Sequence, residues 1–368
     1  MFLVPAALAV QERFRSPLPG RNSVTTMRMS LAWWSILILM ALLVGWRHEV
    51  GGDWESYQNL FVKAQYASQI NGWWWNDPGY RLLEWIAERA SLGIYGVNLM
   101  AGAVFSYGLV VFCRHLPRPW LALAVAVPYL VIILGMGYSR QGVALGCIMV
   151  GLVALIDGRA KRFLLWAVLA ATFHKSAVLL IPMAALAASR HRLFTGILVA
   201  VVTTASYVLL LAESIGTLNA GYIEAEYQSE GALVRLLMNA LPAGLLLWKR
   251  KRFGLTLAQG RLWFWFAISS LALLGFYFVV PSSTAVDRVA LYLQPLQLMV
   301  FANLPEALGR RRCAKNGTAI RSGNLTNSGW VLLVLAYYGA VEFVWLNFSS
   351  HAPAWLPYRF YPLVWLFA

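Results

Sequence analysis

The stretch RAKRFLLWAVLAATFHKSAVLLIPMAALAASRHR, residues 159–192, holds a run of 26 residues, 163–188, between two groups of basic residues. A helix needs about 20 mostly apolar residues to cross a bilayer. Cytoplasmic loops are rich in Lys and Arg, so both ends of this run are expected on the cytoplasmic side. One spanning helix cannot return to the side where it began. The stretch therefore predicts two short arms of a re-entrant hairpin, with a polar apex at residues 173–176 that lines a protein cavity.

The rest of the chain has the composition of a membrane protein. Of its 368 residues, 60% are hydrophobic and only 12% are charged, whereas soluble domains carry roughly 25% charged residues. So large an apolar fraction cannot be hidden inside one water-soluble core, which excludes a soluble globular protein. Further helical stretches are predicted at 31–46, 91–112, 121–138, 142–156, 195–212, 231–248, 262–280, 289–304 and 329–346.

These stretches predict an all-α, polytopic integral membrane protein with about ten helical elements plus the re-entrant hairpin. We expect a cytoplasmic segment at 1–29, then a single membrane domain at 30–368 with an outer loop at 47–90. The net charge of +15 would suit a nucleic-acid partner. However, the basic residues gather between apolar stretches, which is the pattern that sets membrane topology, so no nucleic acid is expected.

Metal and cofactor motifs are missing from the sequence. Cys113, Cys147 and Cys313 are widely spaced and form no CxxC pair, so zinc ribbons and disulfide frameworks are not supported. No Walker loop, GxGxxG or HExxH motif occurs either, and these motifs would have signalled phosphate, dinucleotide or zinc binding. We therefore expect no metal and no cofactor.

The outer loop contains two acids, Asp53 and Glu55, on either side of Trp54. A carboxylate suits an acid–base role or the clamping of sugar hydroxyls. Aromatic rings suit sugar rings, because each has an apolar face and a polar edge. The run 73–75, three tryptophans, fits sugar contact, but an aromatic belt at the membrane interface explains it as well. For Asp53, a structural role at the interface is an equal alternative to catalysis.

Several cations break the rule that basic residues lie on the cytoplasmic side. Arg140 is the only charged residue in 119–156 and falls at an outer turn, where it either snorkels to headgroups or binds an anion. Asp287 and Arg288 form either a local ion pair or, through the arginine, a phosphate site. Arg359 is a weaker candidate of the same kind.

The polar pair at the hairpin apex, His174 and Lys175, is the most unusual feature of the sequence. A histidine can accept a proton near neutral pH, and a lysine at membrane depth must be paired, hydrated or interfacial. Lys175 and the outer arginines are together suited to bind an anion. The activated sugar donors outside a bacterial membrane are lipid-linked pyrophosphates, so a pyrophosphate is the expected anion.

Five short motifs, in order along the chain, resemble those of one known family. They are Gly51-Gly52-Asp53-Trp54-Glu55-Ser56-Tyr57, Asp77-Pro78-Gly79-Tyr80, Arg140-Gln141-Gly142-Val143-Ala144, Phe173-His174-Lys175-Ser176-Ala177 and Asp287-Arg288-Val289-Ala290-Leu291-Tyr292. The second motif has Asp where the family has Glu. From about residue 45 to 305 the chain resembles the EpsG type of Wzy-like bacterial polysaccharide polymerases.

This resemblance implies a GT-C-like, metal-independent membrane glycosyltransferase, and we expect the reaction to invert the configuration at the anomeric carbon. It would polymerise undecaprenyl-diphosphate-linked oligosaccharide repeat units at the periplasmic face of the inner membrane, in O-antigen, capsule or exopolysaccharide assembly. Its partners would be the lipid-linked donor and acceptor and membrane lipid, with a flippase and a chain-length regulator as further candidates. The alternatives are a flippase or transporter for a lipid-linked glycan, and an oligosaccharide ligase or membrane acyltransferase.

Each candidate residue has an expected role in that reaction. Asp53 is expected as the catalytic base if it faces the acceptor, with His174 positioning the pyrophosphate, and the opposite assignment is the alternative. Arg140, Arg288 and Lys175 are expected to hold the pyrophosphate. The residues expected to contact the rest of the substrate are Tyr57, Glu55, Arg81, Gln141, Asp287 and Arg359.

Overall fold

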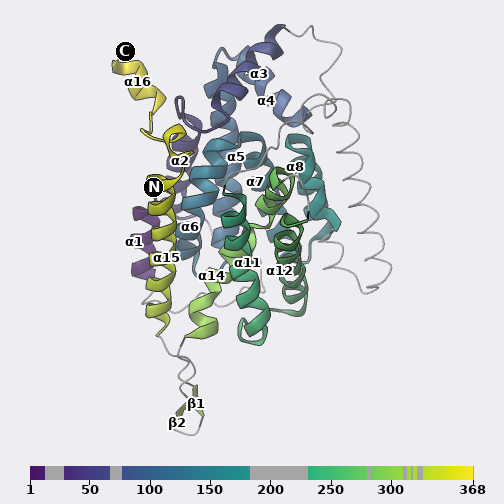
Figure 1. Ribbon diagram of the computed structural model, residues 1–368, viewed down its shortest axis with the longest axis vertical. Helices are drawn as coiled ribbons and strands as arrows, with labels where there is room; N and C mark the ends of the chain where they lie inside the picture. Colours follow the sequence, from purple (N-terminus) through teal and green to yellow (C-terminus); the bar gives the residue numbers. More distant parts are fainter. Residues whose placement is uncertain are drawn as a thin grey trace. The chain divides into compact units, whose positions relative to one another are not determined.

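The computed structural model describes residues 1–12, 29–66, 77–182, 231–279, 283–309, 313–315, 318–320 and 326–367. Within these ranges the structure is helical except for one antiparallel pair, β1 (Cys313–Lys315) and β2 (Thr318–Ile320). Five of the described helices are long and apolar enough to cross a membrane. They are α5 (Gly93–Arg114), α7 (Ser139–Ile156), α11 with its extension (Ala232–Arg252), α12 (Leu257–Tyr277) and α15 (Asn327–Phe348), drawn in Figure 1. The prediction of a helical membrane protein is confirmed.

The chain divides into two compact units, which are described separately. The first unit comprises Met1–Lys175 and Ser328–Ala368, and the second comprises Ser176–Asn327. Besides α5, α7 and α15, the first unit contains α1 (Leu3–Glu12), α2 (Leu31–Gly45), α3 (Trp54–Tyr66), α4 (Pro78–Arg89), α6 (Pro119–Ala126), the π-helix η1 (Val127–Gly135), α8 (Ala160–Phe173), η5 (Ala352–Ala354) and α16 (Tyr361–Phe367).

The core of the first unit is a row of helices in which α5 packs against α2 and α7, and α7 packs against α8. The approach of α5 to α7 depends on two glycines, Gly108 and Gly146. A β-carbon on Gly108 would overlap the backbone of Gly146, and one on Gly146 would lie 2.8 Å from Phe105 Cα. Small residues allow helix backbones to approach closely in membrane proteins. This contact fixes α7, whose first turn carries Arg140, against α5.

Helix α8 ends at the predicted apex of the hairpin. Its last residue is Phe173, and His174 then adopts an extended backbone with φ −158° and ψ 117°. A 3-10 helix, η2 (Lys175–Leu179), follows. The predicted break at His174 is therefore present. The second arm of the hairpin lies largely outside the described residues, so its return to the cytoplasmic side stays a prediction.

Two further helices occupy the segment 47–90, for which the sequence indicated only a loop. Helix α3 begins directly after Asp53, and helix α4 begins at Pro78, a residue favoured at the first position of a helix. On α4 the buried residues recur at helical spacing: they are Tyr80, Leu83, Glu84 and Ala87. Both helices are amphipathic and mostly polar, so a search for long apolar runs does not detect them.

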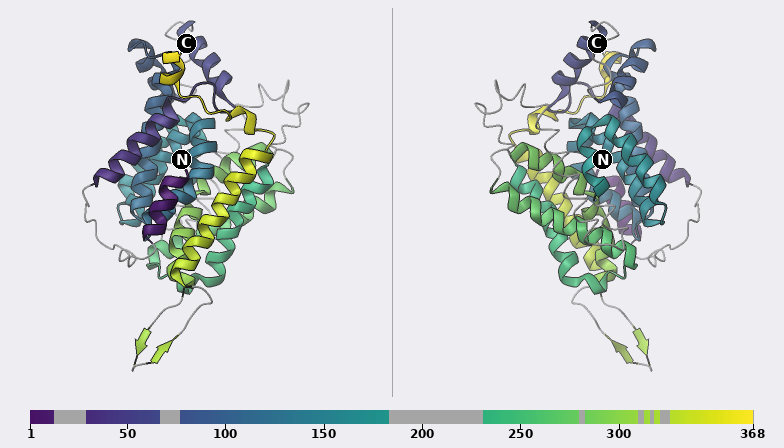
Figure 2. Two further views of the ribbon diagram at one scale, coloured as in Figure 1. Left: turned by 90° about the vertical axis from the view of Figure 1, so that its left-hand side faces the viewer. Right: turned by 90° about the vertical axis from the view of Figure 1, so that its right-hand side faces the viewer.

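The N-terminal helix α1 and the long helix α15 near the C-terminus also belong to the first unit. Helix α1 packs against α6, and the carboxylate of Glu12 accepts a hydrogen bond of 3.2 Å from the backbone nitrogen of Trp120. This acid thus meets one of the unpaired N–H groups at the start of α6. Figures 1 and 2 show α1 and α15 side by side. The cytoplasmic location expected for residues 1–29 stays a prediction.

The second unit is a smaller group of helices. It contains α11 (Ala232–Lys249), η3 (Arg250–Arg252), α12, α13 (Ser283–Ala290), η4 (Leu291–Leu293), α14 (Pro295–Leu308), β1 and β2. Helix α11 packs against α12, α13 and α14. The predicted helical stretch 195–212 and the acidic loop after it lie outside the described residues.

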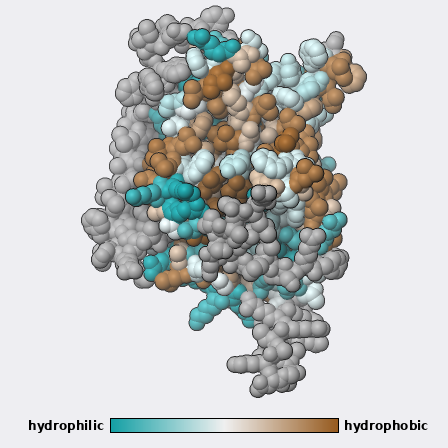
Figure 3. Space-filling view, turned by 180° about the vertical axis from the view of Figure 1, so that it is seen from behind, coloured by the Kyte–Doolittle hydropathy of each residue, from teal (hydrophilic) through white to brown (hydrophobic). Residues whose placement is uncertain are grey.

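Large apolar side chains remain exposed on the helices of both units. On α8, for example, Leu165 is 70% exposed and Val168 is 53% exposed, while on α12 Phe276 is 55% exposed. In Figure 3 brown, apolar residues cover much of the coloured surface. Soluble proteins rarely expose contiguous apolar patches of this kind, so the surface suits contact with lipid.

Candidate functional site

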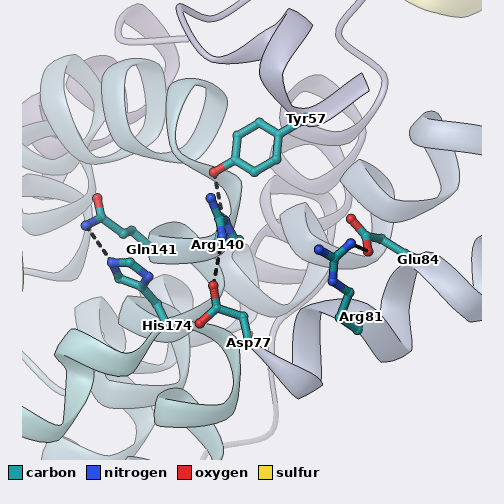
Figure 4. Close-up of polar contacts among 7 residues, drawn as sticks. All are labelled: Tyr57, Asp77, Arg81, Glu84, Arg140, Gln141 and His174. Atoms are coloured by element: carbon teal, nitrogen blue, oxygen red, sulfur yellow. Dashed lines mark hydrogen bonds and ion pairs between the residues drawn. The ribbon is translucent and has the colours of Figure 1, made fainter. Parts of the chain in front are cut away.

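Arg140 lies at the centre of a polar cluster in the first unit, on the first turn of α7 (Figure 4). Its Nη1 atom lies 2.9 Å from Oδ2 of Asp77, which precedes α4. Its backbone nitrogen donates to the hydroxyl of Tyr57 at 3.4 Å, and its guanidinium carbon lies 5.6 Å from the centre of the Tyr57 ring. Three elements, α3, the start of α4 and α7, therefore converge on one arginine.

The two partners of this ion pair differ in exposure. The side chain of Arg140 is 36% exposed, and that of Asp77 is 10% exposed. The carboxylate therefore holds the arginine from the buried side, while the guanidinium keeps an accessible side. This leaves Arg140 able to meet a negatively charged ligand without giving up Asp77.

Asp77 takes its position from the backbone around it. It adopts a left-handed conformation, with φ 50° and ψ 64°, which aspartate tolerates better than most residues. The proline that follows disfavours the right-handed helical conformation at this residue. Burial raises the pKa of Asp77, although Arg140 and Lys175 both lower it in opposition. Lys175 also donates a backbone hydrogen bond to Asp77, which connects the start of α4 to the end of α8.

A second polar contact lies beside the ion pair. Nε2 of Gln141 and Nε2 of His174 are 3.0 Å apart, and Figure 4 shows this pair next to Arg140 and Asp77. With the amide nitrogen as donor, His174 Nε2 accepts and its Nδ1 carries the proton. In this state Nε2 holds the only lone pair of the ring that can take a proton, so His174 acts as a base only when a substrate hydroxyl replaces Gln141 there. Gln141 follows Arg140 directly, so one turn of α7 serves both contacts.

Gly79 allows α4 to approach α8 at this point. A β-carbon at Gly79 would overlap Oγ1 of Thr172 and lie 3.2 Å from two ring carbons of Phe173. Thr172 and Phe173 are the residues just before His174. The glycine of the Asp-Pro-Gly-Tyr motif is thus required for Asp77 and His174 to share one site.

A second ion pair lies on α4, next to Asp77 in Figure 4. Nη1 of Arg81 lies 2.7 Å from Oε2 of Glu84. Glu84 is only 3% exposed, and burial raises its pKa against the opposing effects of Arg81 and Arg140. Arg81, predicted to contact substrate, is therefore engaged by an acid on its own helix.

The other candidates on the outer loop and the C-terminal segment lie in different settings. Asp53 is half-buried at the start of α3, one helical turn before Tyr57, with which it interacts electrostatically. Glu55 is exposed on the same helix. Arg359 pairs with Glu49 at 2.6 Å, and both side chains are at least half exposed. The three tryptophans at 73–75 lie outside the described residues.

The fifth motif belongs to the second unit. Asp287 forms a two-pronged ion pair with Arg235 of α11, with distances of 2.7 Å and 2.8 Å. Its sequence neighbour Arg288 is exposed. Adjacent residues on a helix do not face each other, which explains why Asp287 pairs with a residue 52 positions away and not with Arg288.

Sequence reasoning gave no role to Asp77, the partner of Arg140. The residue stands in one of the quoted motifs, but the motif by itself does not show which cation the acid meets. The available signal was an acid before Pro-Gly in a chain where Arg140 is the only charge in 119–156. Among the described residues, no group of three or more His, Cys, Asp or Glu is placed to hold a metal ion.

Fold and site together describe a helical membrane protein with an acid-anchored arginine beside a histidine. The model of the EpsG family matches residues 31–360, well over half of the 368 residues. The chain therefore belongs to the EpsG family, as its motifs predicted, and this membership suggests a role as a polysaccharide polymerase. No curated protein matches the chain, and no solved structure matches it.

Proposed function

We propose that the protein polymerises undecaprenyl-diphosphate-linked oligosaccharide repeat units at the periplasmic face of the bacterial inner membrane. It would act as an inverting, metal-independent glycosyltransferase of the GT-C-like kind, with membrane lipid as its surroundings. The proposal rests on membership of the EpsG family. The observation that carries it is the cluster in which Arg140, held by Asp77, lies beside Gln141 and His174.

Arg140 suits the pyrophosphate of the lipid-linked donor. A guanidinium binds phosphate oxygens through paired hydrogen bonds, and a cation fixed in place stabilises negative charge that grows on a leaving group. Lys175 interacts electrostatically with Asp77 and supplies a second positive charge nearby. In the second unit, Arg288 is exposed and its neighbouring acid is occupied by Arg235, so we propose Arg288 as a phosphate-binding residue of that unit.

In the reaction, a hydroxyl of the acceptor glycan attacks the anomeric carbon of the donor sugar from the side opposite the pyrophosphate. The new glycosidic bond forms as the bond to the pyrophosphate oxygen breaks. Undecaprenyl diphosphate leaves with the electron pair, and the configuration inverts. The hydroxyl proton passes to a base of the protein.

We assign this base to His174, with Asp53 as the alternative. His174 Nε2 contacts Gln141, the residue after Arg140, so a base there would act near the pyrophosphate. Asp53 is half-buried one turn from Tyr57 and would act from the α3 side. Tyr57, Glu55, Arg81 and the tryptophans at 73–75 would contact sugars, and a flippase and a chain-length regulator would be partners in the membrane.

Polymer length in cells tests the proposal. Arg140→Ala, His174→Ala and Asp53→Asn would be compared at matched protein levels on gels that resolve repeat-unit ladders. Gln58→Ala, at an exposed position of α3, is the control. Arg140→Ala should abolish the ladder, and loss of the base should lower polymerisation by about a hundredfold or more. Normal ladders from all three variants would rule out this site. Activity that EDTA abolishes and added metal restores would contradict metal independence.

A further inference from the structure

Arg47 is the least exposed charged side chain among the described residues, at 1%. Its guanidinium makes hydrogen bonds to four neutral oxygens. These are the backbone oxygens of Val44 at 2.6 Å and Val50 at 3.1 Å, Oδ1 of Asn98 at 3.2 Å and Oγ of Ser139 at 2.8 Å. This burial keeps Arg47 from direct contact with a ligand.

Burying the Arg47 guanidinium with no acidic partner among these hydrogen-bond acceptors costs desolvation free energy. A buried charge loses its hydration, and apolar side chains of similar size often stabilise a core as well or better. Burial lowers the pKa of Arg47 to about 10, so it stays charged at neutral pH. The last turn of α2 supplies an unpaired carbonyl through Val44, which favours a cation at that helix end.

The contacts of Arg47 join three helices at the residue that precedes Arg140. Val44 belongs to α2, Asn98 belongs to α5, and Ser139 is the first residue of α7. The Ser139 hydroxyl also donates to Asn98 Oδ1 at 3.2 Å. The start of α7 is thus held by a closed set of hydrogen bonds on the buried side, directly behind the turn that carries Arg140.

We propose that Arg47 is a positioning residue for the Arg140 site. By holding Ser139, it fixes the first turn of α7 so that Arg140 reaches Asp77 and Gln141 reaches His174. It acts through Ser139 and touches no substrate. The inference rests on the proposed function, because it assumes that Arg140 and His174 perform the reaction.

The test uses purified full-length protein in detergent, with a lipid-linked repeat unit as substrate and inorganic pyrophosphate as a competing anion. Arg47→Lys keeps the charge but cannot make all four hydrogen bonds. Ser139→Ala removes only one hydroxyl and leaves Arg47 in place. Arg118→Lys is the matched control, because Arg118 is also buried, at 2% exposure, but donates to the backbone of Glu12.

We expect kcat per folded molecule to fall about tenfold to a hundredfold in Arg47→Lys and Ser139→Ala, because small misplacements of catalytic groups have effects of that size. The inhibition constant for pyrophosphate should rise in both variants, because a misplaced Arg140 would bind the anion more weakly. Arg118→Lys should change neither quantity. A purely structural role for Arg47 would lower the yield of folded protein and leave kcat and the inhibition constant unchanged.

Two outcomes separate this inference from the proposed function. If Arg140→Ala weakens pyrophosphate inhibition while folded Arg47→Lys and Ser139→Ala behave as wild type, the positioning role is overturned and the site stands. If Arg140→Ala itself leaves pyrophosphate inhibition unchanged, the proposed site is wrong, and the positioning role falls with it. Should Arg47→Lys fail to fold, Ser139→Ala decides the question alone.

Discussion

Asp77 holds Arg140 in place before any ligand arrives. A free arginine side chain carries about 2 kcal/mol of rotamer entropy, and part of that loss would otherwise count against binding. The ion pair of 2.9 Å to a carboxylate that is 10% exposed, together with the Tyr57 ring, restricts the side chain in advance. The acid to which the sequence gave no role thus fixes the position of the arginine.

Replacement of Asp77 by Asn should therefore impair the reaction without removing Arg140. Asn keeps the shape and one hydrogen bond, but the charge that anchors the guanidinium is lost. We expect turnover to fall about tenfold or more, measured as repeat units joined per folded molecule. Asp157→Asn is the control: Asp157 pairs with Arg159 at the other end of α7 and should leave turnover near wild type. Equal turnover in Asp77→Asn and wild type would refute the anchoring role.

As the solution is acidified, activity should be lost at a higher pH than it would be if Asp77 had the pKa of an ordinary aspartate. Burial raises the pKa of Asp77 above its usual 3.8, so the ion pair to Arg140 is lost as pH falls through that raised value. Stability depends on pH in the opposite direction, because the folded protein binds the Asp77 proton more tightly than the unfolded chain does. The contribution of this protonation to the unfolding free energy is fully present below the unfolded pKa of Asp77 and is lost as pH rises through its folded pKa.

Measured together, pH–rate profiles and thermal unfolding followed by tryptophan fluorescence check this prediction. Activity should decline on acidification in a range above pH 3.8 where Asp77 itself does not lower the unfolding temperature. In Asp77→Asn that part of the acid limb should disappear. An acid limb that Asp77→Asn leaves unmoved would show that another group is responsible.

The start of α4 and the end of α8 together build the site. The sequence placed the long apolar helices well, because runs such as 91–112 and 262–280 overlap α5 and α12 with shifts of a few residues at each end. It also located the break at His174 from the basic residues on both sides. It missed α3 and α4, because polar helices that pack one face lack the apolar runs that mark a span.

Gly79→Ala tests whether the close approach of these two helices matters. The added β-carbon would overlap Thr172 Oγ1, and overpacking of this kind costs about 1–3 kcal/mol. Relief of the overlap should move Asp77 away from His174 and Arg140, so turnover should fall as well as the unfolding temperature. Gly275→Ala is the control, because no atom lies within 4 Å of a β-carbon there.

A second substitution makes the same test more specific. Thr172→Ala removes the atom that the new β-carbon would meet, so Gly79→Ala combined with Thr172→Ala should recover much of the lost turnover. A double variant that is as impaired as Gly79→Ala alone would point to a cause other than this contact. Non-additive effects are expected between residues that touch.

For the whole molecule, the sequence located the motifs but not the contacts between them. It singled out Arg140 and His174 from their charge in apolar surroundings. It did not predict that Arg140 meets Asp77, because these residues are 63 positions apart and their contact depends on how α4 packs. The pairing of Asp287 with Arg235 was missed for the same reason, since tertiary packing decided between candidates that the sequence left open.

The charge pattern predicts the orientation of the chain in the membrane. Residue 58, on exposed polar α3, should face the periplasm, and residue 251, within the basic η3, should face the cytoplasm. Gln58→Cys should react with a membrane-impermeant maleimide in cells with a permeabilised outer membrane, and Lys251→Cys only after lysis. Native Cys113 and Cys147 are buried, and Cys313 would be replaced by Ser. Labelling of residue 251 in unlysed cells would contradict the predicted topology.

Whether the Arg140 site joins lipid-linked repeat units is decided by product analysis, in which purified protein in lipid vesicles is given one defined undecaprenyl-diphosphate-linked repeat unit. We predict glycans of two and more repeat units, one undecaprenyl diphosphate released per bond formed, and no such products from folded Arg140→Ala. Transfer to another lipid or protein would instead indicate a ligase, and translocation without bond formation a flippase. Either result with wild-type protein, or full polymerisation by Arg140→Ala, would contradict a polymerase site at Arg140.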